Sequence, residues 1–190
     1  MYGKSAADAL VEYHVANGGV SRHEKFDVFL KQILPAHGLK EGGEGRIPTI
    51  ELLLDDFAEE VCRGLISCEV AEGLSELRST FPDSNWIVVS GGVQDELRRV
   101  FSERGIANYF DSGIFGSPDS KDIILRRELA KGTIRQPALF FGDSVYDCDA
   151  AERAGLEFVF VSGWTEAQGW QNFVLERGIR EILAIKSLLL

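Results

Sequence analysis

The stretch Ala138-Leu139-Phe140-Phe141-Gly142-Asp143-Ser144 decides how the chain is expected to fold. Four apolar residues in a row, closed by a glycine and polar side chains, are typical of a strand that is buried on both faces. Two similar runs occupy residues 86–89, before Ser90-Gly91-Gly92, and residues 158–161, before Ser162-Gly163. Buried strands of this kind belong to a parallel sheet.

Amphipathic stretches separate these runs, at about residues 94–103, 123–131 and 147–154. The alternation predicts an α/β fold with a doubly wound, Rossmann-like parallel sheet. In such sheets ligands bind at the carboxyl ends of the strands. Ser90, Asp143 and Ser162 stand at those ends, so chemistry is expected there.

The first seventy residues have helical periodicity and no convincing strand. Apolar residues recur at helical spacing in three segments that begin near Ser5, Ser21 and Pro48. The sequence therefore predicts a helical domain over residues 1–70 and an α/β core domain over residues 71–190.

The composition limits the kinds of molecule that the chain is expected to bind. With 30 acidic against 20 basic residues, the net charge of -10 would repel nucleic acid from most of the surface. No run approaches the length of a membrane span, and the N-terminus lacks a signal-peptide core, so we expect no membrane partner and a cytoplasmic location. The three cysteines form no Cys-x-x-Cys pair, which favours reduced thiols in the core.

Asp143 and Asp147 form the most specific pattern, Gly142-Asp143-Ser144-x-x-Asp147. A carboxylate at a strand end and another near the start of the next helix can face one point, which suits Mg2+. The alternative is structural: Asp143 caps the helix and Asp147 is a favourable charge near its N-terminus.

Two further features suit an anion. Ser90 and Gly91 place a hydroxyl and open backbone amides at a strand end, and Lys121 can set an ammonium against a phosphate. Each feature alone has an ordinary structural explanation. Ser90 and Gly91 can form a simple loop turn, and Lys121 can be a solvated surface lysine.

Three stretches taken together resemble the second, third and fourth motifs of the haloacid dehalogenase superfamily, in its phosphoglycolate-phosphatase and β-phosphoglucomutase-like branch. They are, in order, Val88-Val89-Ser90-Gly91-Gly92, Lys121 and Phe140-Phe141-Gly142-Asp143-Ser144-x-x-Asp147. The resemblance implies a Mg2+-dependent phosphatase of a small phosphorylated metabolite. It also implies that Ser90 and Gly91 bind the phosphoryl group, that Lys121 neutralises it as a catalytic residue, and that Asp143 and Asp147 hold the metal.

The helical part then resembles the helical cap of that family. Gly18-Gly19-Val20-Ser21-Arg22-x-x-Lys25 is similar to its substrate-specificity stretch, which implies that Arg22 and Lys25 reach the substrate. A plain helix cap at Ser21 with solvated Arg22 and Lys25 is an equal alternative.

The first motif of the family, Asp-x-Asp-Gly-Thr, does not occur in the sequence. It carries the nucleophilic aspartate on the central strand, so we expect that strand to be absent, the Mg2+ site to be weakened and the chain as given to lack phosphatase activity. One hypothesis is an enzyme shortened at its N-terminus. A second is a non-catalytic phosphate-binding or interaction module completed by a partner strand, with strand exchange in a homodimer as one form. A third is an unrelated flavodoxin-like or receiver-like domain.

Overall fold

The computed structural model describes residues 3–17, 20–38 and 48–189. The chain divides into two compact units, Met1–Leu65 and Ile66–Leu190, each of which is described by itself. Within the described ranges, no helix is both long enough and apolar enough to cross a membrane.

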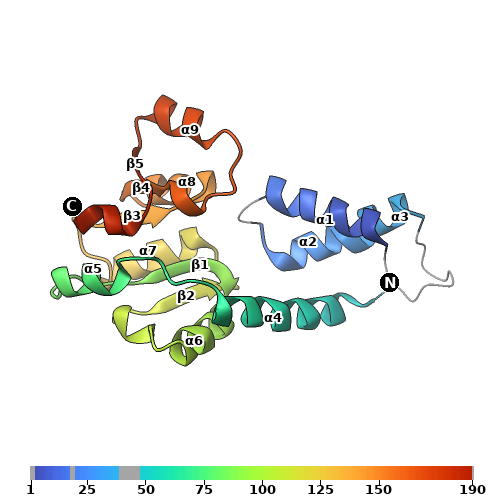
Figure 1. Cartoon of the computed structure of the whole chain (residues 1–190), viewed down its shortest axis with the longest axis horizontal. Coiled ribbons are helices and arrows are strands. Elements are labelled where there is room, and N and C mark those ends of the chain that lie inside the picture. Colours follow the sequence, from blue (N-terminus) through green and yellow to red (C-terminus); the bar gives the residue numbers. More distant parts are fainter. Residues whose placement is uncertain (1–2, 18–19, 39–47, 190) are drawn as a thin grey trace. The chain divides into compact units, whose positions relative to one another are not determined.

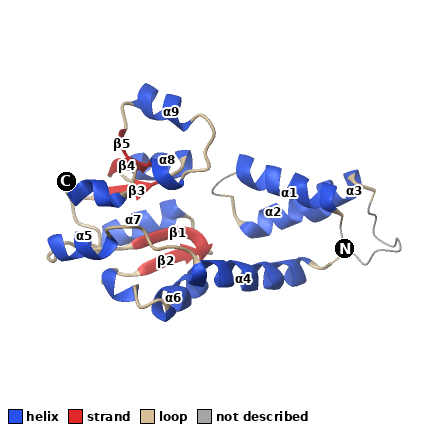
Figure 2. Cartoon of the chain, in the orientation of Figure 1, coloured by secondary structure: helices blue, strands red, loops and turns tan. Residues whose placement is uncertain are grey.

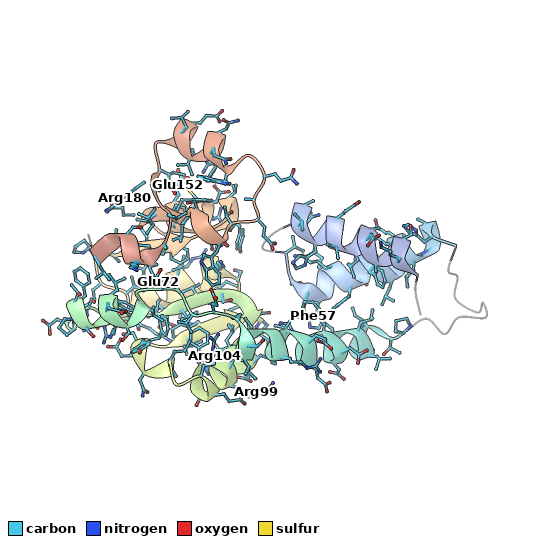
Figure 3. All side chains as sticks on the ribbon, viewed as in Figure 1. Phe57, Glu72, Arg99, Arg104, Glu152 and Arg180 are labelled. Atoms are coloured by element: carbon cyan, nitrogen blue, oxygen red, sulfur yellow. The ribbon has the colours of Figure 1, made fainter. Side chains whose placement is uncertain are left out.

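The described residues of the first unit are helical (Figure 1). Its core is formed by Ala6, Phe26, Phe29 and Leu34, against which Phe57 packs. The Phe26 and Phe57 rings meet edge to face with centroids 5.5 Å apart, and Figure 3 labels Phe57 on its helix. The elements are α1 (Lys4–Ala16), α2 (Arg22–Val28), a π-helical turn (Phe29–Ile33), α3 (Leu34–Ala36) and α4 (Ile50–Ser67), whose last residues enter the second unit.

The second unit alternates strands and helices, as the apolar runs predict. Short 3-10 turns lie at Ala107–Tyr109, Ser162–Trp164 and Ile185–Leu189. The longer elements are α5 (Leu74–Thr80), β1 (Val88–Val93), α6 (Gln94–Glu103), β2 (Ile114–Ser117), α7 (Lys121–Lys131), β3 (Leu139–Gly142), α8 (Val145–Arg153), β4 (Glu157–Val161), α9 (Trp170–Arg177) and β5 (Arg180–Ile182).

All described strand pairs are parallel, so the predicted α/β class is confirmed (Figure 2). The strands form two separate ladders, β1-β2 and β3-β4-β5. Val88 lies opposite Ile114 in the first ladder, and Phe141 lies opposite Val159 in the second. No ladder joins β1 to β3 in the described residues.

The two ladders share one hydrophobic core. Val89 of β1 and Phe140 of β3 both pack against a buried cluster that includes Leu125 of α7 with Ala150 and Ala151 of α8. Helices α7 and α8 therefore hold the two ladders together from one face of the sheet.

The limits predicted for the first strand are wrong. Residues 86–89 were expected to form it, whereas β1 starts at Val88 and continues through Ser90 to Val93. The backbone N–H of Trp86 donates to the Asp111 carboxylate instead of to a ladder. The register with β2 is irregular between Val89 and Val93. There Gly116 is required, because a Cβ on it would lie 2.3 Å from the Gly92 carbonyl oxygen.

Candidate functional site

The candidate site lies at the carboxyl ends of the strands. Lys121 is the first residue of α7, and Asp147 lies in the first turn of α8. The Lys121 Nζ atom pairs with Asp147 Oδ1, and the two side chains are only 14% and 5% exposed. The pair brings together residues that are 26 positions apart in the sequence. Lys121 is therefore not the solvated lysine of the simple alternative, whereas Asp147 does lie near a helix N-terminus, as its alternative states.

Asp147 is held in place by its neighbours. Ser144 Oγ donates to Asp147 Oδ2 at 2.7 Å and accepts from the Asp147 backbone N–H at 3.2 Å. Ser144 rather than Asp143 therefore caps α8. Gly142 is needed for the close approach of strand and helix, since a Cβ there would lie 2.4 Å from Asp147 Cβ.

Asp143 follows β3 directly and is exposed at the surface. Partial desolvation raises the pKa of its carboxyl, and the negative charge of Asp147 raises it further, while the Lys121 ammonium opposes the shift. Thr165 Oγ1 donates to the Asp143 carbonyl oxygen at 2.6 Å and so ties the loop after β4 to this strand end. The Asp143 and Asp147 carboxylates therefore influence each other electrostatically, and their joint role as metal ligands stays a prediction.

Ser90 lies within β1 rather than after it. Its hydroxyl oxygen accepts from the Gly92 backbone N–H at 3.1 Å, whereas Gly91 is exposed. Across the described ranges, no hydrogen bond joins Ser90 to Lys121, Asp143 or Asp147. Asp143 follows β3, and Lys121 and Asp147 lie in the first turns of the helices after β2 and β3, whereas Ser90 is the third of the six residues of β1.

Asp143 and Asp147 could supply some, but not all, of the ligands of a magnesium ion. Mg2+ is commonly held by one or two carboxylates together with water and phosphate oxygens. Burial raises the pKa of Asp143 most and the charge of Asp147 adds to the rise, so a cation here would favour the charged carboxylate. Asp147, however, is already paired with Lys121. The described residues contain no group of three or more His, Cys, Asp or Glu side chains placed to hold a metal, so the remaining ligands would have to be water, backbone or substrate oxygens.

Arg22 and Lys25 lie in α2 of the first unit. Ser21 caps this helix, accepting from the Glu24 backbone N–H at 3.2 Å. The Arg22 guanidinium lies over the Phe57 ring at 5.1 Å. Lys25 is buried, so the alternative of a solvated lysine is wrong for this residue. Its stem packs in the helical core while its Nζ atom contacts His14 Nδ1 at 3.3 Å, and desolvation lowers its pKa.

Three residues at the site were missed by sequence reasoning. Ser144 orients Asp147, Thr165 ties down Asp143, and the Tyr146 ring lies 5.9 Å from Lys121 Nζ. The position of Ser144 at the start of a predicted helix was an available signal for a cap. Nothing in the local sequence connects Thr165 to the site.

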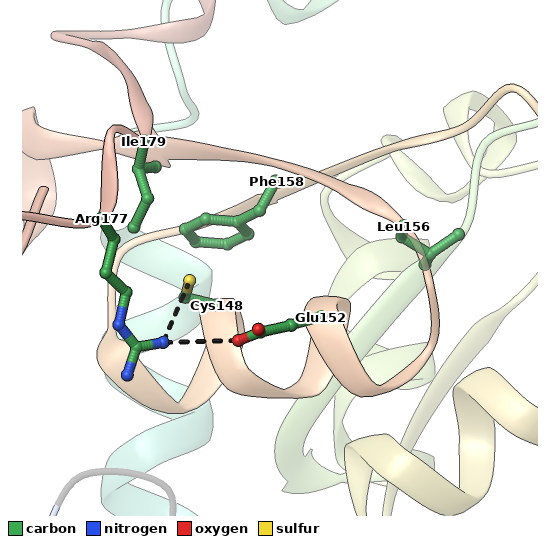
Figure 4. Close-up of a pocket in the computed structure, with 6 residues that line it drawn as sticks. All are labelled: Cys148, Glu152, Leu156, Phe158, Arg177 and Ile179. Atoms are coloured by element: carbon green, nitrogen blue, oxygen red, sulfur yellow. Dashed lines mark hydrogen bonds and ion pairs between the residues drawn. The ribbon is translucent and has the colours of Figure 1, made fainter.

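A separate hollow lies in the second unit, with a volume of about 500 Å³ (Figure 4). Arg177 Nη1 contacts Cys148 Sγ at 4.0 Å and Glu152 Oε2 at 3.5 Å at its edge, and burial raises the pKa of the Cys148 thiol. None of the predicted site residues line this hollow. The lining residues are Cys148, Glu152, Leu156, Phe158, Arg177 and Ile179.

No protein-family model and no curated protein matches this sequence. Solved structures do match its fold. A candidate β-phosphoglucomutase from Thermotoga maritima has a TM-score of 0.64 and 17% identity over 99% of this chain and 87% of its own. A candidate HAD-type hydrolase from Bacillus subtilis, solved with magnesium bound, has a TM-score of 0.61 and 18% identity over 98% and 78%. A haloacid dehalogenase-like protein of unknown function from Agrobacterium tumefaciens has a TM-score of 0.57 and 18% identity over 98% and 87%.

These neighbours define the class of fold. The chain has the α/β fold of haloacid-dehalogenase-like hydrolases, which confirms the resemblance drawn from the motifs at the level of fold. At identities below 20% the likeness extends to the fold alone.

Proposed function

We propose that this chain carries the phosphate-binding and magnesium-binding residues of a haloacid-dehalogenase-type phosphatase that acts on a small phosphorylated metabolite. The observation that supports the proposal best is the Lys121–Asp147 ion pair. In this pair the lysine proposed to bind phosphate contacts Asp147, one of the two proposed metal ligands.

Each residue has a role that follows from its chemistry. Lys121 supplies positive charge against a phosphate, and Ser90 with the Gly91 backbone N–H supplies hydrogen-bond donors. Asp143 and Asp147 would hold Mg2+, which neutralises phosphate charge when bound. Arg22 and Lys25 are proposed to face the substrate from the helical domain. The burial of Lys25 against His14 makes Arg22 the stronger candidate of the two.

We further propose that the 190 residues do not hydrolyse phosphate esters by themselves, because they offer no nucleophilic aspartate. The single Asp-x-Asp in the sequence is Asp147-Cys148-Asp149. Both of its carboxylates are engaged, Asp147 by Lys121 and Asp149 by Arg177 at 2.7 Å. Since Asp147 is proposed to hold Mg2+ and Asp149 pairs with Arg177, we propose neither as the nucleophile.

Calorimetric titration of the chain with MgCl2 and inorganic phosphate tests the binding part of the proposal. We expect phosphate binding that depends on Mg2+ and is lost in Lys121→Met. Lys31→Met, which removes an exposed lysine of the first unit, is the matched control and should bind as the unchanged chain does. Absence of Mg2+-dependent phosphate binding would overturn the proposed site.

Hydrolysis of p-nitrophenyl phosphate tests the catalytic part. We expect no release of nitrophenol above that of a heat-denatured sample, with or without Mg2+. Mg2+-dependent turnover that disappears in Lys121→Met would show that another group replaces the aspartate. Reading the gene in frame upstream of Met1 for Asp-x-Asp-Gly-Thr tests the related hypothesis of a shortened enzyme.

A second candidate function is that of an interaction module completed by a strand from a partner, with or without strand exchange between two copies. The observation that favours it is the division of the strands into two ladders within one compact unit.

A further inference from the structure

The hollow shown in Figure 4 lies wholly within the second unit, because all of its lining residues belong to Ile66–Leu190. Its volume of about 500 Å³ falls in the range of small-molecule sites, roughly 300–1,000 Å³. The lining residues come from α8, from the start of β4 with the residue before it, and from the end of α9 with the segment that follows. The hollow is therefore a feature of the fold separate from the candidate phosphate and magnesium site.

Part of the lining of the hollow is apolar. Leu156 is buried, and Phe158 and Ile179 are half-buried. The Phe158 ring is held by its neighbours, since it stacks on Phe140 with centroids 6.2 Å apart and meets Phe160 edge to face at 6.4 Å. A fixed aromatic ring beside an aliphatic side chain offers a ready surface for the apolar body of a ligand.

Three charged side chains meet at the edge of the hollow. Arg177 Nη1 pairs with Asp149 Oδ1 at 2.7 Å and lies 3.5 Å from Glu152 Oε2. Cys148 adds no charge at neutral pH, because burial raises the pKa of its thiol. One guanidinium and two carboxylates give this group a net charge of minus one.

The surplus charge belongs to Glu152. Asp149 makes the shorter contact with Arg177, whereas the contact of Glu152 is longer than a hydrogen bond of about 2.9 Å. Across the described residues, the Glu152 side chain makes no other ion pair or hydrogen bond, and it is 75% exposed. Arg177 is also held over the Phe173 ring at 4.9 Å. Asp149 therefore neutralises Arg177, and Glu152 presents a carboxylate that a further cation can bind.

We propose that this hollow binds a small molecule with an apolar body and one ammonium group. The apolar body contacts Phe158 and Ile179, and the ammonium group donates to the Glu152 carboxylate. The net charge of -10 favours the approach of a cation over that of an anion. An acid of the same shape is a poorer ligand, because its carboxylate would be repelled by the surplus charge of Glu152. The inference goes beyond both proposed functions and does not need phosphate or Mg2+.

Titration of the whole chain with phenethylamine at pH 7, followed through the amide NMR spectrum of the isotope-labelled chain, tests the proposal. We expect saturable shifts at residues 148–158 and 177–179. Hydrocinnamic acid has a similar apolar body and the opposite charge, and it should bind at least about tenfold more weakly. Ethylamine has the charge without the ring, and it should not saturate over the same range of concentration.

Two variants separate the local charge from the overall charge of the chain. Glu152→Gln should weaken phenethylamine binding about fivefold, the effect of losing one exposed ion pair, and should remove most of the preference over hydrocinnamic acid. Glu103→Gln is the matched control, because it removes one negative charge from an exposed position on α6, away from the hollow. Its affinity for phenethylamine should equal that of the unchanged chain.

Four results would each overturn the proposal. They are the absence of saturable binding, equal affinity for the amine and the acid, an equal loss in Glu152→Gln and Glu103→Gln, and shifts centred on Lys121 and Asp147 instead of on the hollow. Calorimetric titration with Mg2+ and phosphate keeps this inference distinct from the proposed function. Intact phosphate binding in a chain that does not bind the amine would refute the inference alone.

Discussion

Lys121, which is partly buried, and Asp147, which is buried, form an ion pair that connects the start of α7 to the start of α8. Helix α7 follows β2 of one ladder and α8 follows β3 of the other, so the pair links the two halves of the second unit. Asp147 also accepts from Ser144, which satisfies its second carboxylate oxygen. A buried carboxylate of this kind depends on its cation, because an unpaired charge in the interior is costly.

Lys121→Met should destabilise the second unit by about 3 kcal/mol, because it leaves the Asp147 carboxylate buried without its cation. Adding Asp147→Asn should recover much of that loss, since the double variant buries no charge at this position. Urea unfolding of the unchanged chain, both single variants and the double variant measures the coupling between the two residues. Strictly additive effects would contradict the ion pair.

Gly142→Ala should destabilise the same unit and weaken Mg2+ binding. Its Cβ would lie 2.4 Å from Asp147 Cβ, so Asp147 must move and the start of α8 with it. Gly91→Ala is the matched control for stability, because a Cβ at Gly91 meets nothing within 4 Å. Equal unfolding midpoints for the two variants would show that the close contact of β3 and α8 is absent in solution.

Asp143→Asn should stabilise the chain at pH 7. Desolvation and the charge of Asp147 raise the pKa of Asp143 in the folded chain. The contribution of Asp143 to the free energy of unfolding is therefore fully present only below its unfolded pKa, near 4. It is lost as pH rises through the raised folded value. The gain from the asparagine should therefore disappear below about pH 4. Thermal unfolding across pH measures the difference.

Asp111→Asn should have the opposite effect to Asp143→Asn, because the pKa of Asp111 is lowered and not raised. The Trp86 backbone N–H, which donates to the Asp111 carboxylate, holds the pKa of Asp111 below its ordinary value, with Arg78 adding to the effect. Its contribution is present at neutral pH and lost as pH falls through the lowered pKa. The variant should thus be less stable than the unchanged chain at pH 7. Shifts of the same sign for Asp111→Asn and Asp143→Asn would contradict these assignments.

Glu128→Gln should cost about 2–3 kcal/mol, because it removes hydrogen bonds between charged groups in the interior. Burial alone would raise the pKa of Glu128, but donors on Arg127, Lys131 and Thr133 outweigh it and the pKa is lowered. The stability from Glu128 is therefore present above about pH 4.5 and lost as pH falls through the lowered value. Urea unfolding at pH 7 and pH 3 measures the loss. An exposed control, Glu103→Gln, should change the free energy of unfolding by less than about 0.5 kcal/mol.

Much of the second unit could be predicted from its sequence. The helix expected over residues 94–103 coincides with α6, because its apolar positions repeat at helical spacing and Gly105 follows it. Continuous apolar runs indicated parallel strands, since only a sheet covered on both faces buries every residue of a strand. The order of Ser90, Lys121, Asp143 and Asp147 indicated the fold class that the solved structures share.

Features that depend on tertiary contacts could not be predicted. The extension of β1 to Val93 depends on pairing with β2, which no local propensity specifies. The sequence predicted that Lys121 lies against a phosphate. Its pairing with Asp147 follows from the packing of α7 beside α8, which the sequence does not specify. Lys25 has the sequence context of a surface lysine, and only the approach of His14 from α1 explains how its ammonium is accommodated in the helical unit.

The divided sheet also bears on the colloidal behaviour of the chain. At neutral pH, the net charge of -10 makes copies repel one another at long range, which offsets the tendency of the exposed Leu139 and Phe141 to bring strand edges together. That repulsion fades near the isoelectric point of about 4.8 and is screened by salt. The surplus of acidic residues is therefore expected to oppose association through the strand edges that have no ladder partner among the described residues.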